Sequence, residues 1–267
     1  MLFILLLAGC GVIAGITTIL FGFGGGFLVV PLLYHSLLLQ QVPSQAAMPV
    51  AVATSTCVMV VTASWATWRQ ARQGAVHWPA IRRLIGPLSL GAVLGAILAT
   101  KADGDWLRWG FVSYLLVTVA DSLTRRGFVR LAASPPAPAC SRPLSLGVFG
   151  ILIGGIAAAL GVGGSVMTVP MMRRRGLPMN EAAATANPLT LPIALAATVT
   201  YALTEAPSDV SGPLGLGYID IAAFIAIAAG SWIGIQLAMP WTQRIPDTLH
   251  ARVYIGLLIV FTIVMAW

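Results

Sequence analysis

Charged residues are scarce in this chain of 267 residues. Only 9% of the sequence is charged and 58% is hydrophobic, whereas an average soluble domain has roughly 25% charged residues. So few charges cannot cover the surface of a soluble protein, which excludes a soluble enzyme. The apolar runs are also much longer than the alternating segments of about ten residues that build a membrane β-barrel. The composition therefore predicts an α-helical membrane protein.

Cysteines and catalytic motifs are also few. Cys10, Cys57 and Cys140 lie far apart without metal-ligand spacing, and Cys10 and Cys57 fall inside apolar runs, where thiols pack as small hydrophobic groups. The sequence has no HExxH, no GxxxxGK[ST] and no spacing typical of a Ser/His/Asp site. We therefore expect no metal, no cofactor and no catalytic residues.

The net charge of +7 comes from basic residues that cluster in short gaps between apolar runs. Such gaps mark the cytoplasmic side of a membrane protein, so the charges indicate topology rather than nucleic-acid binding. Lys101 and Arg108 fall in outward-facing gaps. The other thirteen fall in gaps assigned to the cytoplasm: Arg69, Arg72, Arg82, Arg83, Arg125, Arg126, Arg130, Arg142, Arg173, Arg174, Arg175, Arg244 and Arg252.

The chain repeats itself. When residues 11–31 are placed over residues 150–170, seven of the 21 columns are identical. The likeness resumes where Ala53-Thr54-Ser55 faces Ala184-Thr185-Ala186, although Pro31 precedes Thr54 by 23 positions and Pro170 precedes Thr185 by only 15. The identical columns are Gly11/Gly150, Gly15/Gly154, Gly22/Gly161, Gly24/Gly163, Gly25/Gly164, Val30/Val169 and Pro31/Pro170.

Each half contains one run that is too short to cross a bilayer of roughly 30 Å. The expected runs are residues 2–20, 27–39, 45–68, 79–100 and 106–123, then 144–160, 165–172, 181–203, 217–239 and 252–267. The short runs at 27–39 and 165–172 predict a broken or re-entrant hairpin at the start of each half, followed by three full transmembrane helices. An odd number of crossings separates the two hairpins, which predicts inverted repeats, the common plan of secondary transporters.

The predicted fold class is therefore all-α, a polytopic membrane protein built from two inverted repeats. Residues 1–123 form the first repeat and residues 144–267 the second. The basic, proline-rich segment 124–143, with Pro135-Pro136-Ala137-Pro138, is expected to join them in the cytoplasm.

The two glycine turns carry a resemblance to a known family. Gly22-Phe23-Gly24-Gly25-Gly26 before Pro31, and Gly161-Val162-Gly163-Gly164-Ser165 before Pro170, look like the sulfite exporter TauE/SafE family of membrane permeases. The resemblance covers both halves. It implies a multi-pass carrier in the bacterial inner (plasma) membrane for a small sulfur-containing anion such as sulfite, sulfoacetate or thiosulfate.

A physical reason exists for glycine clusters inside a membrane. Irregular backbone is tolerated there only around a cavity or inside protein, and a helix that begins there presents free N–H groups and the positive end of its dipole. Such a start binds an anion without cations. We therefore predict that the substrate contacts Gly24, Gly25 and Gly26 from one half and Gly163, Gly164 and Ser165 from the other.

Polar side chains on the adjoining long helices are expected to complete this site. The candidates are Thr54, Ser55, Thr185, Asn187 and Thr190, and Asn187 is the sharpest because Pro188 interrupts helical hydrogen bonding beside it. The alternative is purely structural, in that glycines allow close helix packing and hydroxyl groups bond within or between helices. Asp121, Glu181 and Asp220 are the candidates for proton coupling, but the favoured roles are surface pairing with arginines for Asp121 and Glu181 and a helix cap for Asp220. His250 is expected to lie in a cytoplasmic loop.

The favoured function is a secondary transporter that moves this anion by alternating access, coupled to H⁺ or Na⁺ if it is ion-driven. An anion channel, or a membrane subunit of a sulfur-metabolism complex, remains an alternative. The expected partners are the anion, the coupling ion and the lipid bilayer. A homo-oligomer is compatible with the sequence, and nucleic acid is not expected.

Overall fold

The computed structural model describes residues 2–74, 76, 78–124, 143–174, 177–205, 215–242 and 244–267. The predicted linker therefore lies almost entirely outside the described residues. The first half consists of α1 (Leu2–Phe21), α2 (Gly26–Leu39), α3 (Ser44–Arg72), α4 (Trp78–Arg82), α5 (Ile85–Lys101) and α6 (Gly104–Thr124).

The second half repeats the order of the five longer helices, but it has a β-hairpin in the position of α4 and a 3-10 helix after α10. It consists of α7 (Pro143–Leu160), α8 (Ser165–Arg174), α9 (Met179–Leu203), β1 (Gly215–Leu216), β2 (Ile219–Asp220), α10 (Ile221–Ala238), the 3-10 helix η1 (Met239–Trp241) and α11 (Asp247–Ala266). Strands β1 and β2 pair antiparallel, with Leu216 opposite Ile219. The all-α prediction holds except for this hairpin, which was not predicted. The hairpin includes residues 217–220, the start of the apolar run expected at 217–239.

Among the described residues, five helices are long and apolar enough to cross a membrane: α1, α3, α9, α10 with η1, and α11. Helices α2 and α5 and the Gly147–Leu160 part of α7 are apolar but shorter. Helix α6 has 21 residues but carries Asp105, Arg108 and Asp121, and it is not among the five. The multi-pass prediction is thus supported, while the expected three full crossings in each half are supported only in part.

Helices α3 and α9 form the centre of the molecule. In their most apolar segments 78% and 67% of the residues are buried, compared with 44% in α1, α10 and α11. The central pair therefore contacts protein on most sides, whereas the outer helices expose large apolar side chains such as Leu98, Val117 and Leu237. Exposed apolar faces of this kind fit a lipid environment.

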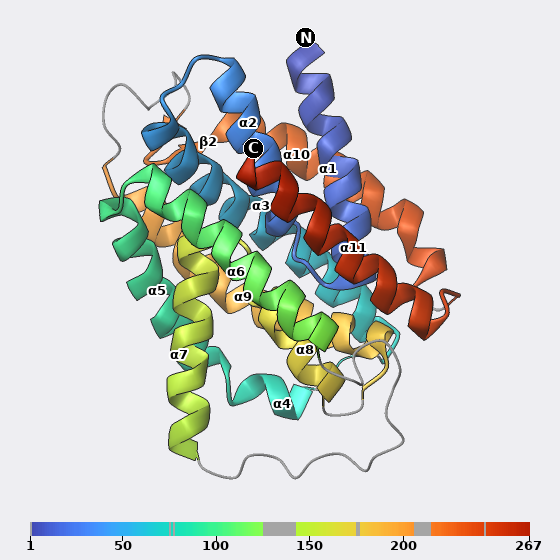
Figure 1. The fold of residues 1–267 in the computed structure, drawn as a ribbon. Helices are drawn as coiled ribbons and strands as arrows, with labels where there is room; N and C mark the ends of the chain where they lie inside the picture. Colours follow the sequence, from blue (N-terminus) through green and yellow to red (C-terminus); the bar gives the residue numbers. More distant parts are fainter. Residues whose placement is uncertain are drawn as a thin grey trace.

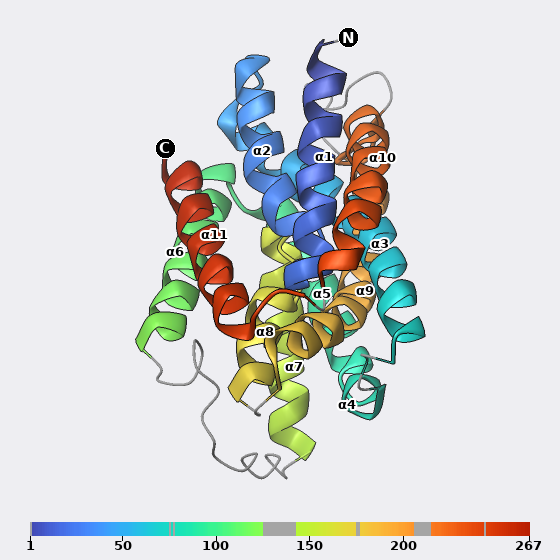
Figure 2. The ribbon, with the colours of Figure 1, turned by 90° about the vertical axis from the view of Figure 1, so that its right-hand side faces the viewer.

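The outer helices are exchanged between the halves. Helix α1 packs along α10, and α7 packs along α5 (Figure 2). Each contact pairs two Gly-x-x-x-Gly segments so closely that a Cβ atom added to any of these glycines would overlap the facing helix, the close packing typical of membrane helices. The paired segments are Gly11/Gly15 with Gly230/Gly234, and Gly150/Gly154 with Gly91/Gly95.

The two hairpins open toward opposite ends of the molecule. Figure 1 shows the N-terminal end of α1 and the C-terminal end of α2 at the top, whereas the outer ends of α7 and α8 lie toward the bottom. Helix α4 also lies at the bottom, and the α10–α11 connection lies at the lower right. Exposed Arg82 and Arg83 lie at and directly after the end of α4, and exposed Arg244 lies in the α10–α11 connection. We call this end, which also includes Arg72 at the end of α3, the basic end.

Candidate anion-binding site

Both predicted breaks are present, because each hairpin changes direction at its glycines. Helix α1 ends at Phe21 and α2 begins at Gly26, and α7 ends at Leu160 before α8 begins at Ser165. Positive φ angles, which only glycine adopts readily, make the turns possible. They are 74° at Gly22, 65° at Gly24 and 87° at Gly25, then 65° at Gly161 and 70° at Gly163.

Each break exposes the start of a short helix. The first helical bond of α2 joins the N–H of Val29 to the carbonyl of Gly25 (3.2 Å), and that of α8 joins the N–H of Thr168 to the carbonyl of Gly164 (2.9 Å). The three amides before each of these bonds have no intrahelical acceptor. No side chain caps α2 at Gly25, so its N-terminus remains available to an anion.

The break of each half lies against the long central helix of the other half. A Cβ atom on Gly22 would lie 2.5 Å from the carbonyl oxygen of Ala183 in α9, and one on Gly161 would lie 3.0 Å from Cα of Val52 in α3. When Thr54 is matched with Thr185, Val52 matches Ala183. The same contact is therefore made twice, once by each repeat.

Met59 and Thr190 lie between the two breaks. A Cβ atom on Gly24 would be 2.7 Å from Cγ2 of Thr190 and 3.6 Å from Sδ of Met59, and one on Gly163 would be 2.9 Å and 3.0 Å from the same two atoms. Both side chains are fully buried. They too are counterparts in the repeat, because 131 positions separate Met59 from Thr190 and Thr54 from Thr185. Thr190 was predicted as a site residue and Met59 was not, although the repeat spacing relates the two positions.

Two hydroxyl groups of α3 bond to carbonyl groups at the breaks. Thr62 donates to the carbonyl of Gly24 (2.5 Å) and Ser55 donates to the carbonyl of Gly161 (3.1 Å). These bonds fix the turns, so Ser55 supports the second break from α3. Thr62 was not predicted. It follows the Ala53-Thr54-Ser55 segment by two helical turns, on the same face of α3 as Ser55.

Thr54 occupies a different place from the one expected. Its Oγ1 accepts a hydrogen bond from the N–H of Asp220 (3.0 Å), and Asp220 in turn caps α10 by accepting from the N–H of Ala223 (3.0 Å). The predicted cap at Asp220 is therefore confirmed. Thr54 joins α3 to the start of α10.

Three buried polar atoms of the predicted site lack a hydrogen-bond partner among the described residues. They are Oγ of Ser165, Oγ1 of Thr185 and Oδ1 of Asn187. Buried polar groups are normally paired because an unpaired one costs about 1–3 kcal/mol. By contrast, the hydroxyl of Thr190 donates to the carbonyl of Ala186 (3.1 Å). The unpaired atoms are groups that a bound solute or water would satisfy.

Asn187 connects the site to a surface pocket. Its Nδ2 donates to the carbonyl of Thr18 (3.2 Å) and to Oε1 of Gln70 (2.9 Å), and Nε2 of Gln70 donates to the carbonyl of Ile19 (3.2 Å). Helix α9 continues through Pro188 without a break, although a proline inside a helix often kinks or ends it. Pro188 has no N–H for the carbonyl of Ala184, which lines the same pocket.

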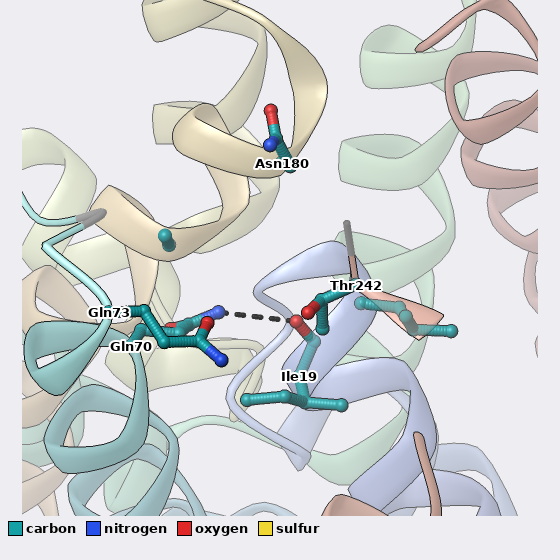
Figure 3. Close-up of a pocket in the computed structure, with 7 residues that line it drawn as sticks. Ile19, Gln70, Gln73, Asn180 and Thr242 are labelled. Atoms are coloured by element: carbon teal, nitrogen blue, oxygen red, sulfur yellow. Dashed lines mark hydrogen bonds between the residues drawn. The ribbon is translucent and has the colours of Figure 1, made fainter. Parts of the chain in front are cut away.

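The pocket opens at the basic end. Gln73 and Asn180 are exposed at its rim, whereas Gln70 is only 4% exposed. Figure 3 shows the Gln70 amide directed at the backbone of Ile19, with Thr242 beside it. The lining is neutral and rich in amide groups: Ile19, Leu20, Gln70, Gln73, Asn180, Ala184 and Thr242.

A buried ion pair lies near this pocket without lining it. The guanidinium group of Arg173, at the end of α8, is 2.9 Å from the carboxylate of Asp247, which also accepts from the N–H of Met179 (2.7 Å). His250 is 1% exposed, lies in α11 and bonds to the carbonyl of Leu20 (2.7 Å). The expectation that His250 lies in a loop is therefore wrong, because α11 begins at Asp247, directly after Pro246.

Comparison with known proteins places the chain among transporters. The family profile for the sulfite exporter TauE/SafE matches residues 7–265. The chain belongs to the sulfite exporter TauE/SafE family. It is 26% identical over 263 residues to a probable membrane transporter protein of Haemophilus influenzae, covering 98% of each chain. No solved structure matches it. This TauE/SafE protein is thus a membrane transporter rather than an enzyme.

Proposed function

We propose that this TauE/SafE protein carries a small sulfur-containing anion, such as sulfite, sulfoacetate or thiosulfate, by alternating access between two inverted repeats. The main support is the meeting of the two glycine breaks around Met59 and Thr190. Two helix starts directed into one buried place supply N–H donors from both halves. Sulfur oxyanions accept several hydrogen bonds at once and fit such a donor set.

The sidedness of the chain follows from its charges. We take the basic end as cytoplasmic, since Lys and Arg are retained on that side of the bacterial inner membrane, and this assignment also puts linker 124–143 in the cytoplasm. The pocket at Gln70 then opens inward. The hairpins that open at opposite ends, and the repeated contacts of Val52 and Ala183, support an inverted arrangement.

Three of the described arginines bond to groups away from the breaks. Arg69 bonds to Gln236 and lies over Trp65, Arg108 bonds to carbonyl groups at the end of α11, and Arg173 pairs with Asp247. The anion would therefore be held by backbone amides and neutral side chains. Weak, charge-neutral binding of this kind allows release on either side.

Complete burial of Met59 and Thr190 favours a carrier over an open anion channel. The deciding experiment measures uptake of radiolabelled sulfite, sulfoacetate and thiosulfate into proteoliposomes, together with single-channel recording. We expect saturable uptake of at least one anion without unitary currents. Unitary currents would favour the channel, and no saturable uptake of any anion would contradict the proposal.

Substitutions at the breaks test the site. Gly25→Leu and Gly164→Leu insert side chains against Thr62 and Ile193, where an added Cβ atom already lies at 3.0 Å and 2.7 Å, and we expect both to abolish uptake. Gly256→Leu is the matched control, because a Cβ atom there meets no atom within 4 Å. Unchanged uptake in both break variants would remove the proposed site.

A further inference from the structure

The same long-range hydrogen bond occurs once in each half. Nε2 of Gln70, near the end of α3, donates to the carbonyl of Ile19 (3.2 Å), and the hydroxyl of Tyr201, near the end of α9, donates to the carbonyl of Ala158 (3.1 Å). Ile19 and Ala158 are each the third residue from the end of the helix that precedes a glycine break.

The repeat relates these two bonds residue by residue. Gln70 and Tyr201 are 131 positions apart, like Thr54 and Thr185, whereas Ile19 and Ala158 are 139 positions apart, like the paired glycines of the two breaks. The donors differ chemically, an amide in one half and a phenol in the other, yet each ties a central helix to the entry of a break. Their placement is therefore a shared feature of the fold.

At the basic end, the Gln70 bond separates the pocket from the interior. Gln70 is one of the buried residues that line the pocket, and its side chain accepts a hydrogen bond from the Asn187 amide, which is 0% exposed. Release of Gln70 from Ile19 would thus join the pocket to Asn187 and, through the carbonyl of Thr18, to the end of α1 at the first break.

At the opposite end, the hairpin of β1 and β2 covers the corresponding position. Gly217 (φ 57°) lies so close to α9 that an added Cβ atom would overlap the carbonyl of Tyr201 and lie 2.8 Å from that of Thr204. The N–H of Tyr218 donates to the Tyr201 carbonyl (3.4 Å). Thr204 is the counterpart of Gln73 at the pocket rim, and Tyr201 is 0% exposed.

We infer that Gln70 and Tyr201 are the two gates of the transport route, Gln70 toward the basic end and Tyr201, under the β1–β2 hairpin, toward the opposite end. The inference rests on the proposed transport function. In the described residues, the pocket at the basic end reaches Gln70, and the β1–β2 hairpin covers Tyr201 at the opposite end. Alternating access then requires the two neutral hydrogen bonds to open in turn, each exposing the place between the breaks to one side.

Thiol accessibility from each side of the membrane tests the gates without a substrate. The background replaces Cys10, Cys57 and Cys140 by serine and carries Thr190→Cys as a reporter between the breaks. A membrane-impermeant methanethiosulfonate reagent is added to oriented vesicles from one side at a time. We expect Gln70→Ala to raise the labelling rate at least about tenfold from the basic end only, and Tyr201→Phe to raise it similarly from the opposite end only.

Matched controls keep the test specific. Tyr114→Phe removes a buried hydroxyl that has no hydrogen-bond partner among the described residues, and Gln40→Ala removes an exposed amide at the end of α2. Neither should change labelling from either side. Gln70→Glu retains the shape of Gln70 but cannot donate from an ionised carboxylate, so it replaces Gln70→Ala if the alanine variant fails to fold.

The possible results distinguish a failure of the proposed gates from a failure of the proposed substrate class. Increased labelling from both sides in one gate variant, or no increase over the controls, overturns the gates even if sulfite uptake persists. Labelling confined to the expected sides retains the gates, even if none of the three anions is transported. That second result would contradict only the proposed substrate class.

Discussion

Met59 and Thr190 face Gly163 from different halves of the chain, with Sδ and Cγ2 at 3.0 Å and 2.9 Å from the position of an added Cβ atom. The same two side chains face Gly24, at 3.6 Å and 2.7 Å. Because the residues are repeat counterparts, one pair of equivalent positions fills the space between two equivalent breaks. This relationship shows that the two breaks lie together in the fold, on either side of the same two side chains.

The first prediction concerns the backbone of the second break. Gly163→Ala combines a left-handed φ of 70° with contacts near 3 Å, and we expect it to cost roughly 1–3 kcal/mol of stability and to impair transport strongly. Gly256→Ala has open space in a helix and should stabilise by up to about 1 kcal/mol. Thermal unfolding in detergent measures both, and equal melting temperatures would contradict the assignment.

The second prediction concerns the exchanged helices. Gly234→Ala places a methyl group against the carbonyl of Val12, so α10 must move away from α1. We expect a loss of about 1–3 kcal/mol. Gly86→Ala, in α5 with nothing within 4 Å, is the control. If both variants unfold at the temperature of the unmodified protein, the α1–α10 contact is looser than described.

The third prediction concerns the sign of charge that the site accepts. Asn187→Asp replaces the donor to Thr18 and Gln70 by a carboxylate, and we expect it to weaken anion binding roughly tenfold or more through repulsion in a buried place. Asn180→Asp puts the same charge on the exposed rim of the pocket, where solvent screens it, and should weaken binding far less. Equilibrium binding of labelled anion measures the difference, and equal affinities would separate Asn187 from the site.

The fourth prediction concerns the ion pair between Arg173 at the end of α8 and Asp247 at the start of α11. Asp247→Ala removes one partner of the buried Arg173 guanidinium and the acceptor for the Met179 amide, and we expect a loss of about 3 kcal/mol or more. Arg252→Ala, an exposed residue of the same helix, should change stability by about 0.5 kcal/mol or less. A similar melting temperature for both variants would contradict a stabilising role for the pair.

Composition and repeat spacing predicted most of the helices and the position of both breaks. Apolar runs indicate burial in lipid or protein. The glycines shared by the two repeats mark turns whose positive φ angles only glycine adopts readily. The helix ends were less predictable. The run expected from 217 begins as a β-hairpin, because Asp220 caps α10 and delays its start to Ile221.

The site was only partly predictable because its contacts cross between the halves. The hydroxyl of Thr54 made it a candidate for binding the anion, but its Oγ1 accepts a hydrogen bond from the N–H of Asp220 in the other half. Met59 carries no strong hydrogen-bond donor and Gln70 follows the apolar run that ends at residue 68, so neither residue type nor position in the sequence marks them as site residues. Only the three-dimensional pairing of the repeats brings Gln70 to Asn187.

The most direct test of the account is the position of the bound anion. Selenite is a heavier analogue of sulfite, and crystals of the protein grown with it would locate selenium by anomalous scattering. We expect a peak between the two breaks, within hydrogen-bonding distance of backbone amides near Gly26 and Ser165 and beside Thr190. An ordered peak elsewhere, with none between the breaks, would contradict it.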